Sequence, residues 1–321
     1  MKYIYPLIFL ILFKTTLSAQ TNNHIETSDI PLFWHVYDKV IRMKDSIEAV
    51  RIIQEEYINK GSAGLSAIKK FNVFESKDLY HTIKTQQLYL NSIRQATIDI
   101  KNQYAGYQAI FDNFKKTYPL YSYPKVFCTI GNMLVGGFNS DDSNVIVGVE
   151  LAAGTKSAKT DSLNDYLKVF TKANPGIRYL LTHEIVHTQQ THGYQQNMNL
   201  TGICIMEGSA DFIADLLLKR KNSMPYSLYG RKYNNVIKRS FIRDKLESDQ
   251  SILNNWIYNA ALYVSGQIKT RPDLGYYIGY KICESYYNKA KNKNQAIADI
   301  LQINYDDKNS VMLFYNNSGY E

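Results

Sequence analysis

The sequence predicts a helix-rich α+β protein, with a helical N-terminal half followed by a region that adds a small mixed sheet. Two observations lead to this prediction. Apolar residues recur every three or four positions along residues 31–118, which is the period of an amphipathic helix. Two short segments rich in β-branched residues, 125–130 and 144–151, then precede further helical patterns.

The first residues have the features of an export signal. Lys2 gives a basic start, residues 4–13 form an almost unbroken apolar run, and Ala19 ends a short polar segment. We therefore expect residues 1–19 to be a cleaved signal peptide, with export to the periplasm or the extracellular space. Because about ten apolar residues are too few to cross a bilayer as a helix, and no later segment is apolar enough, we expect no transmembrane segment.

Composition limits the class of protein. The chain has 321 residues, 45% of them hydrophobic, so it can bury a substantial core. Its formal net charge is +8, but the lysines are scattered over predicted helices and no nucleic-acid-binding signature accompanies them, so we expect no nucleic-acid partner. The sequence does not predict an oligomeric state. Cys128, Cys204 and Cys283 lack CxxC spacing, which favours buried free thiols, although one pair could bridge in an oxidising compartment.

The N-terminal half is predicted to be helical after a polar linker over residues 20–30. The region 31–120 carries the helical period through three or four expected helices, and Pro119 and Pro124 end it. The region 121–321 then begins with the two predicted strands, joined by a turn or hairpin over 131–143. The second strand, 144–151, is either internal or an edge strand to which an extended peptide could add.

Helices are predicted for most of the remaining chain. The first has Asn174 as its N-cap and Pro175 at its first position, runs from 176 to 192, and stops at Gly193. The tail from Asn304 has no assigned structure. Further helical patterns occupy 203–219, 232–246, 251–267 and 274–291, with a short one near 295.

The helix predicted over 176–192 contains the candidate metal-binding residues. His183, Glu184 and His187 form an HExxH motif, and residues four apart share one face of a helix, so both imidazoles can bind one metal ion. Glu184 lies beside the pair, where its carboxylate can serve as general base toward a water molecule. The surrounding residues are apolar, which is unlike a solvated helix with two unrelated histidines. The third histidine that a metzincin requires soon after the motif is missing from its expected position.

A second helix supplies the remaining ligand. Glu207 lies twenty positions after His187, so two helices that turn back on each other can bring its carboxylate to the histidine pair. Two histidines and one glutamate are a common ligand set for catalytic zinc, so we predict a Zn²⁺ site at His183, His187 and Glu207. Asp211 shares the face of Glu207 and can accept the free N–H of a ligand histidine. Tyr276 and Tyr277 are candidates for a second donor to the oxyanion, and Gly275 and Gly279 permit close packing there.

The segments HEIVHTQQ (183–190) and EGSADF (207–212) resemble a bacterial domain-of-unknown-function family of predicted zinc-dependent proteases, which is related to a gliding-motility lipoprotein. NVIVGVELAAG (144–154) and LGYYIGYKICESY (274–286) also resemble blocks of that family, so the resemblance covers roughly 125–290. It implies a zincin-like fold of the gluzincin type, with His183, His187 and Glu207 as metal ligands, Glu184 as base and Asp211 hydrogen-bonded to a ligand histidine. This chain lacks the lipid-modified Cys of the gliding-type relatives.

The sequence thus predicts an exported zinc metallopeptidase that hydrolyses peptide bonds in a peptide or protein substrate. We favour endopeptidase action because no GxMEN motif for binding an N-terminus is present. The alternative is a zinc-binding, non-proteolytic scaffold or assembly protein of the cell envelope. A purely structural zinc site has no use for Glu184, which favours the enzyme.

Overall fold

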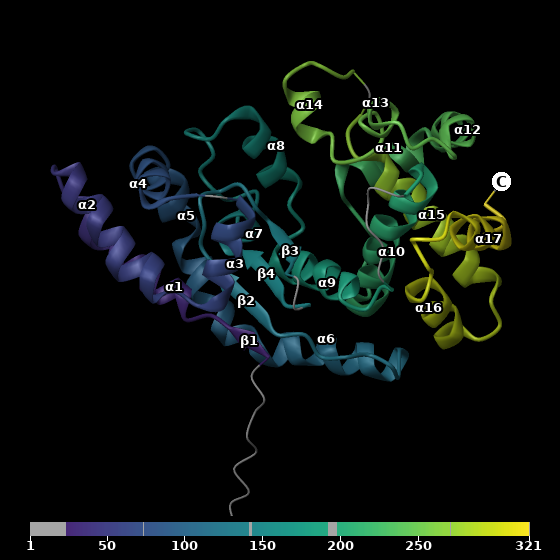
Figure 1. The fold of residues 1–321 in the computed structure, drawn as a ribbon, viewed down its shortest axis with the longest axis horizontal. Helices are drawn as coiled ribbons and strands as arrows, with labels where there is room; N and C mark the ends of the chain where they lie inside the picture. Colours follow the sequence, from purple (N-terminus) through teal and green to yellow (C-terminus); the bar gives the residue numbers. More distant parts are fainter. Residues whose placement is uncertain (1–23, 73, 141–142, 192–197, 270, 321) are drawn as a thin grey trace, which may run out of the picture.

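The computed structural model describes residues 24–72, 74–140, 143–191, 198–269 and 271–320 (Figure 1). The signal peptide predicted over 1–19 and the stop predicted at Gly193 lie outside these residues. The described chain is helix-rich with one small mixed sheet, so the predicted α+β class is confirmed. Among the described residues, no helix combines the length and the apolar character that crossing a membrane requires.

The N-terminal half is divided into more helices than the three or four predicted. The pattern over 76–116 is interrupted where Gln86 leaves helical geometry and where residues 99–103 form a 3₁₀ turn. The predicted linker also differs, since Ile25–Glu26 form strand β1. The described helices of this half are α1 (Asp29–Val40), α2 (Ser46–Ile52), α3 (Ala63–Asn72), α4 (Ser76–Thr85), α5 (Gln87–Ile98) and α6 (Tyr104–Thr117).

The sheet has the order β1-β2-β4-β3. β1, β2 (Val126–Thr129) and β4 (Val145–Gly148) run parallel, and β3 (Gly137–Asn139) runs antiparallel to β4. The segment 144–151, which the sequence left open, is therefore an internal strand, and its end from Val149 onward is helix α7 (Val149–Ala152). β3, from the predicted turn or hairpin, is the edge strand on this side of the sheet.

Helices form most of the region after the sheet, and several begin or end away from their predicted bounds. The helix of the HExxH motif ends at His187 instead of 192, and the polar tail from Asn304 contains a helix. The helices are α8 (Asp165–Ala173), α9 (Ile177–His187), α10 (Leu200–Leu218), α11 (Pro225–Lys232), α12 (Asn234–Asp244), α13 (Gln250–Leu253), α14 (Ala260–Val264), α15 (Leu274–Lys289), α16 (Lys293–Leu301) and α17 (Lys308–Ser318).

Asn174 is not the N-cap of α9. It ends α8, and its side-chain amide donates to the backbone carbonyls of Leu151, Ala152 and Gly154 at 2.7–3.0 Å. Its Oδ1 accepts from the backbone N–H of Gly176, which is the N-cap and has a φ of 92° that favours glycine. A side chain that satisfies three carbonyls ties the start of α9 to the end of α7.

α10 and α15 form the central contact of the C-terminal half, and they lie side by side in Figure 1. A Cβ on Gly279 would lie 1.6 Å from the Cys204 carbonyl oxygen, and a Cβ on Gly208 would lie 2.1 Å from the Tyr280 nitrogen. Only glycine permits these backbones to approach so closely, as predicted for Gly279. Cys128, Cys204 and Cys283 are buried free thiols.

Candidate metal centre

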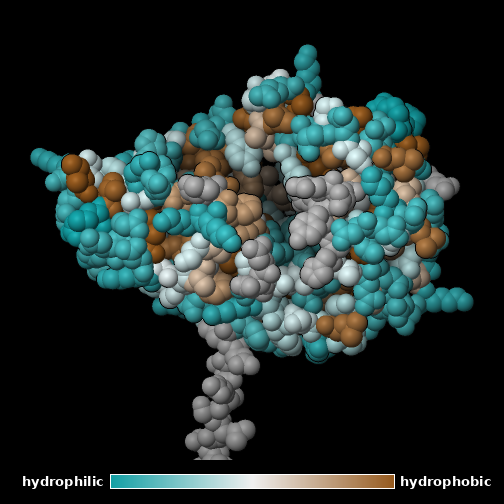
Figure 2. Space-filling model, viewed as in Figure 1, coloured by the Kyte–Doolittle hydropathy of each residue, from teal (hydrophilic) through white to brown (hydrophobic). Residues whose placement is uncertain are grey.

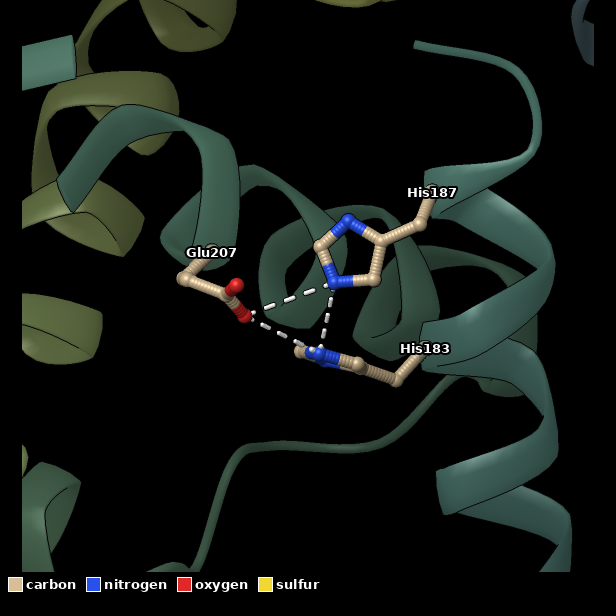
Figure 3. A group of neighbouring side chains, drawn as sticks. All are labelled: His183, His187 and Glu207. Carbon is tan, nitrogen blue, oxygen red and sulfur yellow. Dashed lines mark hydrogen bonds and ion pairs between the residues drawn. The ribbon is translucent and has the colours of Figure 1, made fainter. Parts of the chain in front are cut away.

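α9 and α10 bring three donor atoms to one point (Figure 3). Nε2 of His183 and Nε2 of His187 are 3.0 Å apart, and each lies 3.4 Å from Oε2 of Glu207. Glu207 is the eighth residue of α10, well inside the helix, because α10 begins at Leu200 and not near 203 as predicted. The histidine pair and the distant glutamate therefore converge.

The size of this triangle suits zinc. Donors about 2.0–2.1 Å from a tetrahedral ion are separated from one another by about 3.3 Å. The three observed separations, 3.0, 3.4 and 3.4 Å, are close to that edge. Three protein ligands leave the fourth corner of the tetrahedron for water or substrate, which is the arrangement of catalytic rather than structural zinc sites.

Hydrogen bonds fix which nitrogen of His187 faces the centre. The amide nitrogen of Gln190 donates to the Met206 carbonyl at 2.7 Å and to Oγ of Ser209 at 2.8 Å. Its Oε1 must therefore accept from Nδ1–H of His187, at 2.7 Å. A neutral imidazole with its proton on Nδ1 turns a lone pair on Nε2 toward the ligand triangle, as a metal ligand must.

Asp211 holds His183 in the same way. Nδ1–H of His183 and the Tyr179 hydroxyl donate to Oδ1 of Asp211 at 2.9 and 2.6 Å. Asn222 and Tyr226 donate to Oδ2 at 2.9 and 2.5 Å. Four donors occupy the carboxylate, which is 1% exposed, so its orientation is fixed on both sides. The geometry that the sequence proposed for Asp211 is present, but its three other partners were not predicted.

The charges around the triangle favour a cation. Burial opposes protonation of His183, but hydrogen bonds to Asp211 and Glu207 outweigh it and raise the pKa well above its usual value. His187 shows the same direction, with burial opposed by the charge of Glu207. For Glu207, burial is outweighed by the two imidazoles, which hold its pKa well below its usual value. Three lone-pair donors in a buried site need a shared positive charge, and a divalent ion supplies it.

Glu184 lies beside the triangle without belonging to it. Its side chain contacts Gly137 on edge strand β3, where a Cβ would lie 2.9 Å from both Cγ and Oε1 of Glu184. Burial raises the pKa of Glu184, against the opposing charges of His187 and His183. A carboxylate with a raised pKa accepts a proton more readily, which suits a general base.

The two tyrosines predicted as candidate oxyanion donors, Tyr276 and Tyr277, point in different directions. The Tyr276 ring lies 6.3 Å from the His183 ring, on the side of the metal triangle. Tyr277 points elsewhere, because its hydroxyl donates to Oδ1 of Asn234 at 3.0 Å and its ring packs on Gly230. The hydroxyl that touches a ligand belongs to Tyr258, which donates to Oε1 of Glu207 at 2.5 Å.

Sequence reasoning missed Tyr258. It has a φ of 54°, a left-handed conformation that is unfavourable for a bulky side chain and concentrates at functional sites. The next residue holds it there: the Asn259 backbone N–H donates to Oδ1 of Asp273, and the Asp273 backbone N–H donates to Oδ1 of Asn259. Asp273 is itself left-handed. No periodic pattern in the sequence marks this reciprocal clamp.

A cavity of about 440 Å³ opens at the triangle. We call its two sides the β3–α9 wall and the α11–α15 wall. The lining residues that we assign to the β3–α9 wall are Gly136, Gly137, Leu180 and Glu184, with Phe170 of the adjoining α8, and those of the α11–α15 wall are Tyr226, Tyr258, Arg271 and Tyr276.

Comparison with known proteins agrees with the site. No curated protein and no solved structure matches the chain. The family model DUF2268, described as a predicted Zn-dependent protease, matches residues 138–307, which is more than half of the chain and includes the ligand triangle and Tyr258. The chain therefore belongs to the DUF2268 family of predicted Zn-dependent proteases, as the resemblance in its sequence implied.

Proposed function

We propose that this protein is a zinc-dependent peptidase that hydrolyses peptide bonds. The observation that supports this most is the convergence of two imidazole lone pairs and one carboxylate, with Glu184 beside them at the head of a cavity. A structural zinc site is closed by four protein ligands, whereas this set has three and opens onto space for a substrate.

The residues divide the chemistry among them. Zn²⁺ held by His183, His187 and Glu207 would polarise the scissile carbonyl and make water a stronger nucleophile. Glu184 takes a proton from the attacking water and passes it to the leaving amine. The Tyr258 hydroxyl, which donates to Glu207 in the free protein, would turn from it to donate to the oxygen that becomes negative as the water attacks. Tyr276 provides part of the wall beside His183.

Edge strand β3 is the part of the sheet that we propose binds the substrate backbone. A peptide extended along it would make main-chain hydrogen bonds of the kind that add a strand to a sheet. Gly137 on this strand contacts Glu184, so a peptide bound there would pass the base. We favour endopeptidase action, because a strand-like mode of binding does not require a chain end.

We also propose that the mature protein acts in the periplasm or outside the cell, on the basis of the apolar run over residues 4–13. The test is fractionation of expressing cells combined with N-terminal sequencing of the product. Cleavage after Ala19 and recovery outside the cytoplasm are expected. An intact N-terminus in the cytoplasmic fraction would reject the proposal.

The decisive experiment combines metal analysis with digestion of a peptide library. Purified protein is expected to contain one zinc per chain and to cut library peptides, and a chelator should abolish cutting until zinc is restored. The matched variant is Glu184→Gln, which removes the base and keeps the side-chain shape. It should retain zinc and lose at least about 100-fold in kcat.

Two results would reject the proposed function. One is a protein that binds zinc but cuts no peptide, with Glu184→Gln unchanged in every property, which is the behaviour expected of a scaffold protein. The other is a protein that cuts peptides at the same rate after its metal has been removed.

A further inference from the structure

The cavity beside the metal triangle is mostly apolar, but it is lined by one arginine, Arg271, whose Nε has no hydrogen-bond partner among the described residues. Figure 2 shows a hollow near the middle of this face, beside α8 and below α14 as these elements are labelled in Figure 1. Val169 and Phe170 of α8, with Ala261 and Val264 of α14, are among the apolar residues that line the cavity. Such walls suit a large apolar side chain, since burial of one is worth about 1.5–3 kcal/mol.

Arg271 is the only Lys or Arg among the described residues that line this cavity. It is partly buried, and its Nε is fully enclosed without a hydrogen-bond partner among the described residues. A buried guanidinium N–H without a partner is costly, because its lost hydration is not replaced. An interior position next to an apolar cavity is therefore a poor place for this arginine unless a ligand completes it.

Three acidic residues line the same cavity: Asp211, Asp273 and Glu184, whose side chain lies against Gly137 beside the metal triangle. Asp211 accepts hydrogen bonds from His183, Tyr179, Asn222 and Tyr226. Asp273, two residues after Arg271, accepts from the Asn259 backbone in the clamp that holds Tyr258. None of these carboxylates is a hydrogen-bond partner of Nε of Arg271 among the described residues, so an anion from outside the chain would complete it.

We propose, resting on the function proposed above, that Arg271 binds a carboxylate of the substrate, and that the peptidase prefers peptides combining this carboxylate with a large apolar residue. The planar guanidinium can bind a carboxylate through two parallel hydrogen bonds. The carboxylate is either the free C-terminus of the peptide or the side chain of a Glu or Asp.

Three peptides with a blocked N-terminus and the same apolar residue distinguish a C-terminal carboxylate from a side-chain carboxylate. The first ends in a free carboxylate, the second in an amide, and the third in an amide preceded by Glu. The intact protein should show a kcat/KM about 10- to 100-fold higher for one of the two carboxylate peptides than for the uncharged amide, mainly through KM. Preference for the first peptide means recognition of a chain end, and preference for the third means internal cleavage beside an acidic residue.

Variants then connect this preference to Arg271. Arg271→Met should remove the preference, so that the kcat/KM of the preferred carboxylate peptide falls to that of the uncharged amide, and Arg271→Lys should restore part of it. Arg239→Met, on the exposed face of α12, is the matched control and should keep the full preference. Thermal unfolding of each variant checks that the fold is retained.

A binding measurement separates this inference from the proposed function. Titration of the three peptides into the Glu184→Gln variant should show tighter binding of the preferred carboxylate, and the double variant with Arg271→Met should lose it. Equal binding and equal cleavage of all three peptides by the unchanged protein would overturn the role of Arg271 and leave the peptidase assignment intact. Carboxylate-selective binding without any cleavage would support the role of Arg271 and reject the peptidase assignment.

Discussion

The two walls of the cavity are built in different ways. In the β3–α9 wall, the regular helix α9 carries the HExxH motif and strand β3 contacts its base. The α11–α15 wall collects Tyr226, Tyr258, Arg271 and Tyr276 from separate turns and helices. The first wall carries Glu184, the proposed base, and the second carries residues that would shape a substrate site. Mutations in the two walls should therefore have different kinetic signatures.

The largest effect is expected at Gly137, on the β3–α9 wall. In Gly137→Ala the new methyl group would meet the Glu184 side chain at 2.9 Å, so the flexible carboxylate has to move from its position. Since a displacement of about 1 Å in a catalytic group is expected to cost about 100-fold, and complete loss of a base more, we predict a kcat lower by about 100- to 1,000-fold. Steady-state kinetics on a cleaved library peptide measure this.

The adjacent glycine supplies the control. A Cβ on Gly136 would meet Phe170 and Leu180 at 3.5 and 3.6 Å, which is ordinary van der Waals contact. Gly136→Ala should keep kcat within about threefold, and both variants should retain zinc. If the two substitutions were equally harmful, the contact between Gly137 and Glu184 would not be the reason.

Tyr258 is expected to give the next largest effect, from the opposite wall. Tyr258→Phe removes the hydroxyl next to Glu207 and should lower kcat by about 100-fold with little change in KM, as expected for a donor that acts on the transition state. Tyr277→Phe is the control, because its hydroxyl is turned to Asn234. A kcat that falls in Tyr277→Phe and not in Tyr258→Phe would reverse our assignment.

The two residues that accept hydrogen bonds from the ligand histidines provide a third test, which measures zinc affinity. Asp211 is a fully hydrogen-bonded carboxylate behind His183, whereas Gln190 is a neutral amide behind His187. Asp211→Asn should weaken zinc binding by about 10- to 100-fold, measured by competition with a chelator. Gln190→Leu, which removes the neutral acceptor behind His187, should weaken zinc binding less than Asp211→Asn does. An unchanged affinity in Asp211→Asn would mean that orientation of His183 does not depend on Asp211.

The difference between the two walls also explains which site residues could be predicted from the sequence. His183, His187, Glu207 and Asp211 follow the helical period, so spacing alone places each pair on one face of a helix. Asn174 misled the prediction of a helix start, because its three carbonyl partners come from a segment about twenty residues earlier.

Long-range geometry accounts for the rest of what was missed. Tyr258 reaches Glu207 through two left-handed residues and a clamp to Asp273, none of which has a period. The order of strands in the sheet was equally hidden, because β4 becomes internal only when β3 folds back beside it. Local periodicity therefore predicted the metal ligands, whereas the substrate side of the cavity depended on contacts between distant segments.

The smallest effect is expected behind the β3–α9 wall, at Glu150. This carboxyl is 0% exposed, and its Oε1 accepts from the Met133 backbone in the segment that leads to β3. Burial raises its pKa from its usual value of 4.5 to about 7, so the folded chain holds more protons than the unfolded chain between these pH values. The free energy of unfolding should therefore fall as pH rises through that window, by about 2 kcal/mol between pH 5 and pH 7 from this residue.

Denaturant unfolding at several pH values measures this, and Glu150→Gln should flatten the slope while Glu247→Gln, at an exposed site, should not. If the free energy of unfolding still falls with pH in Glu150→Gln, another group causes the pH dependence, and the stability of the β3–α9 wall does not depend on protonation of Glu150.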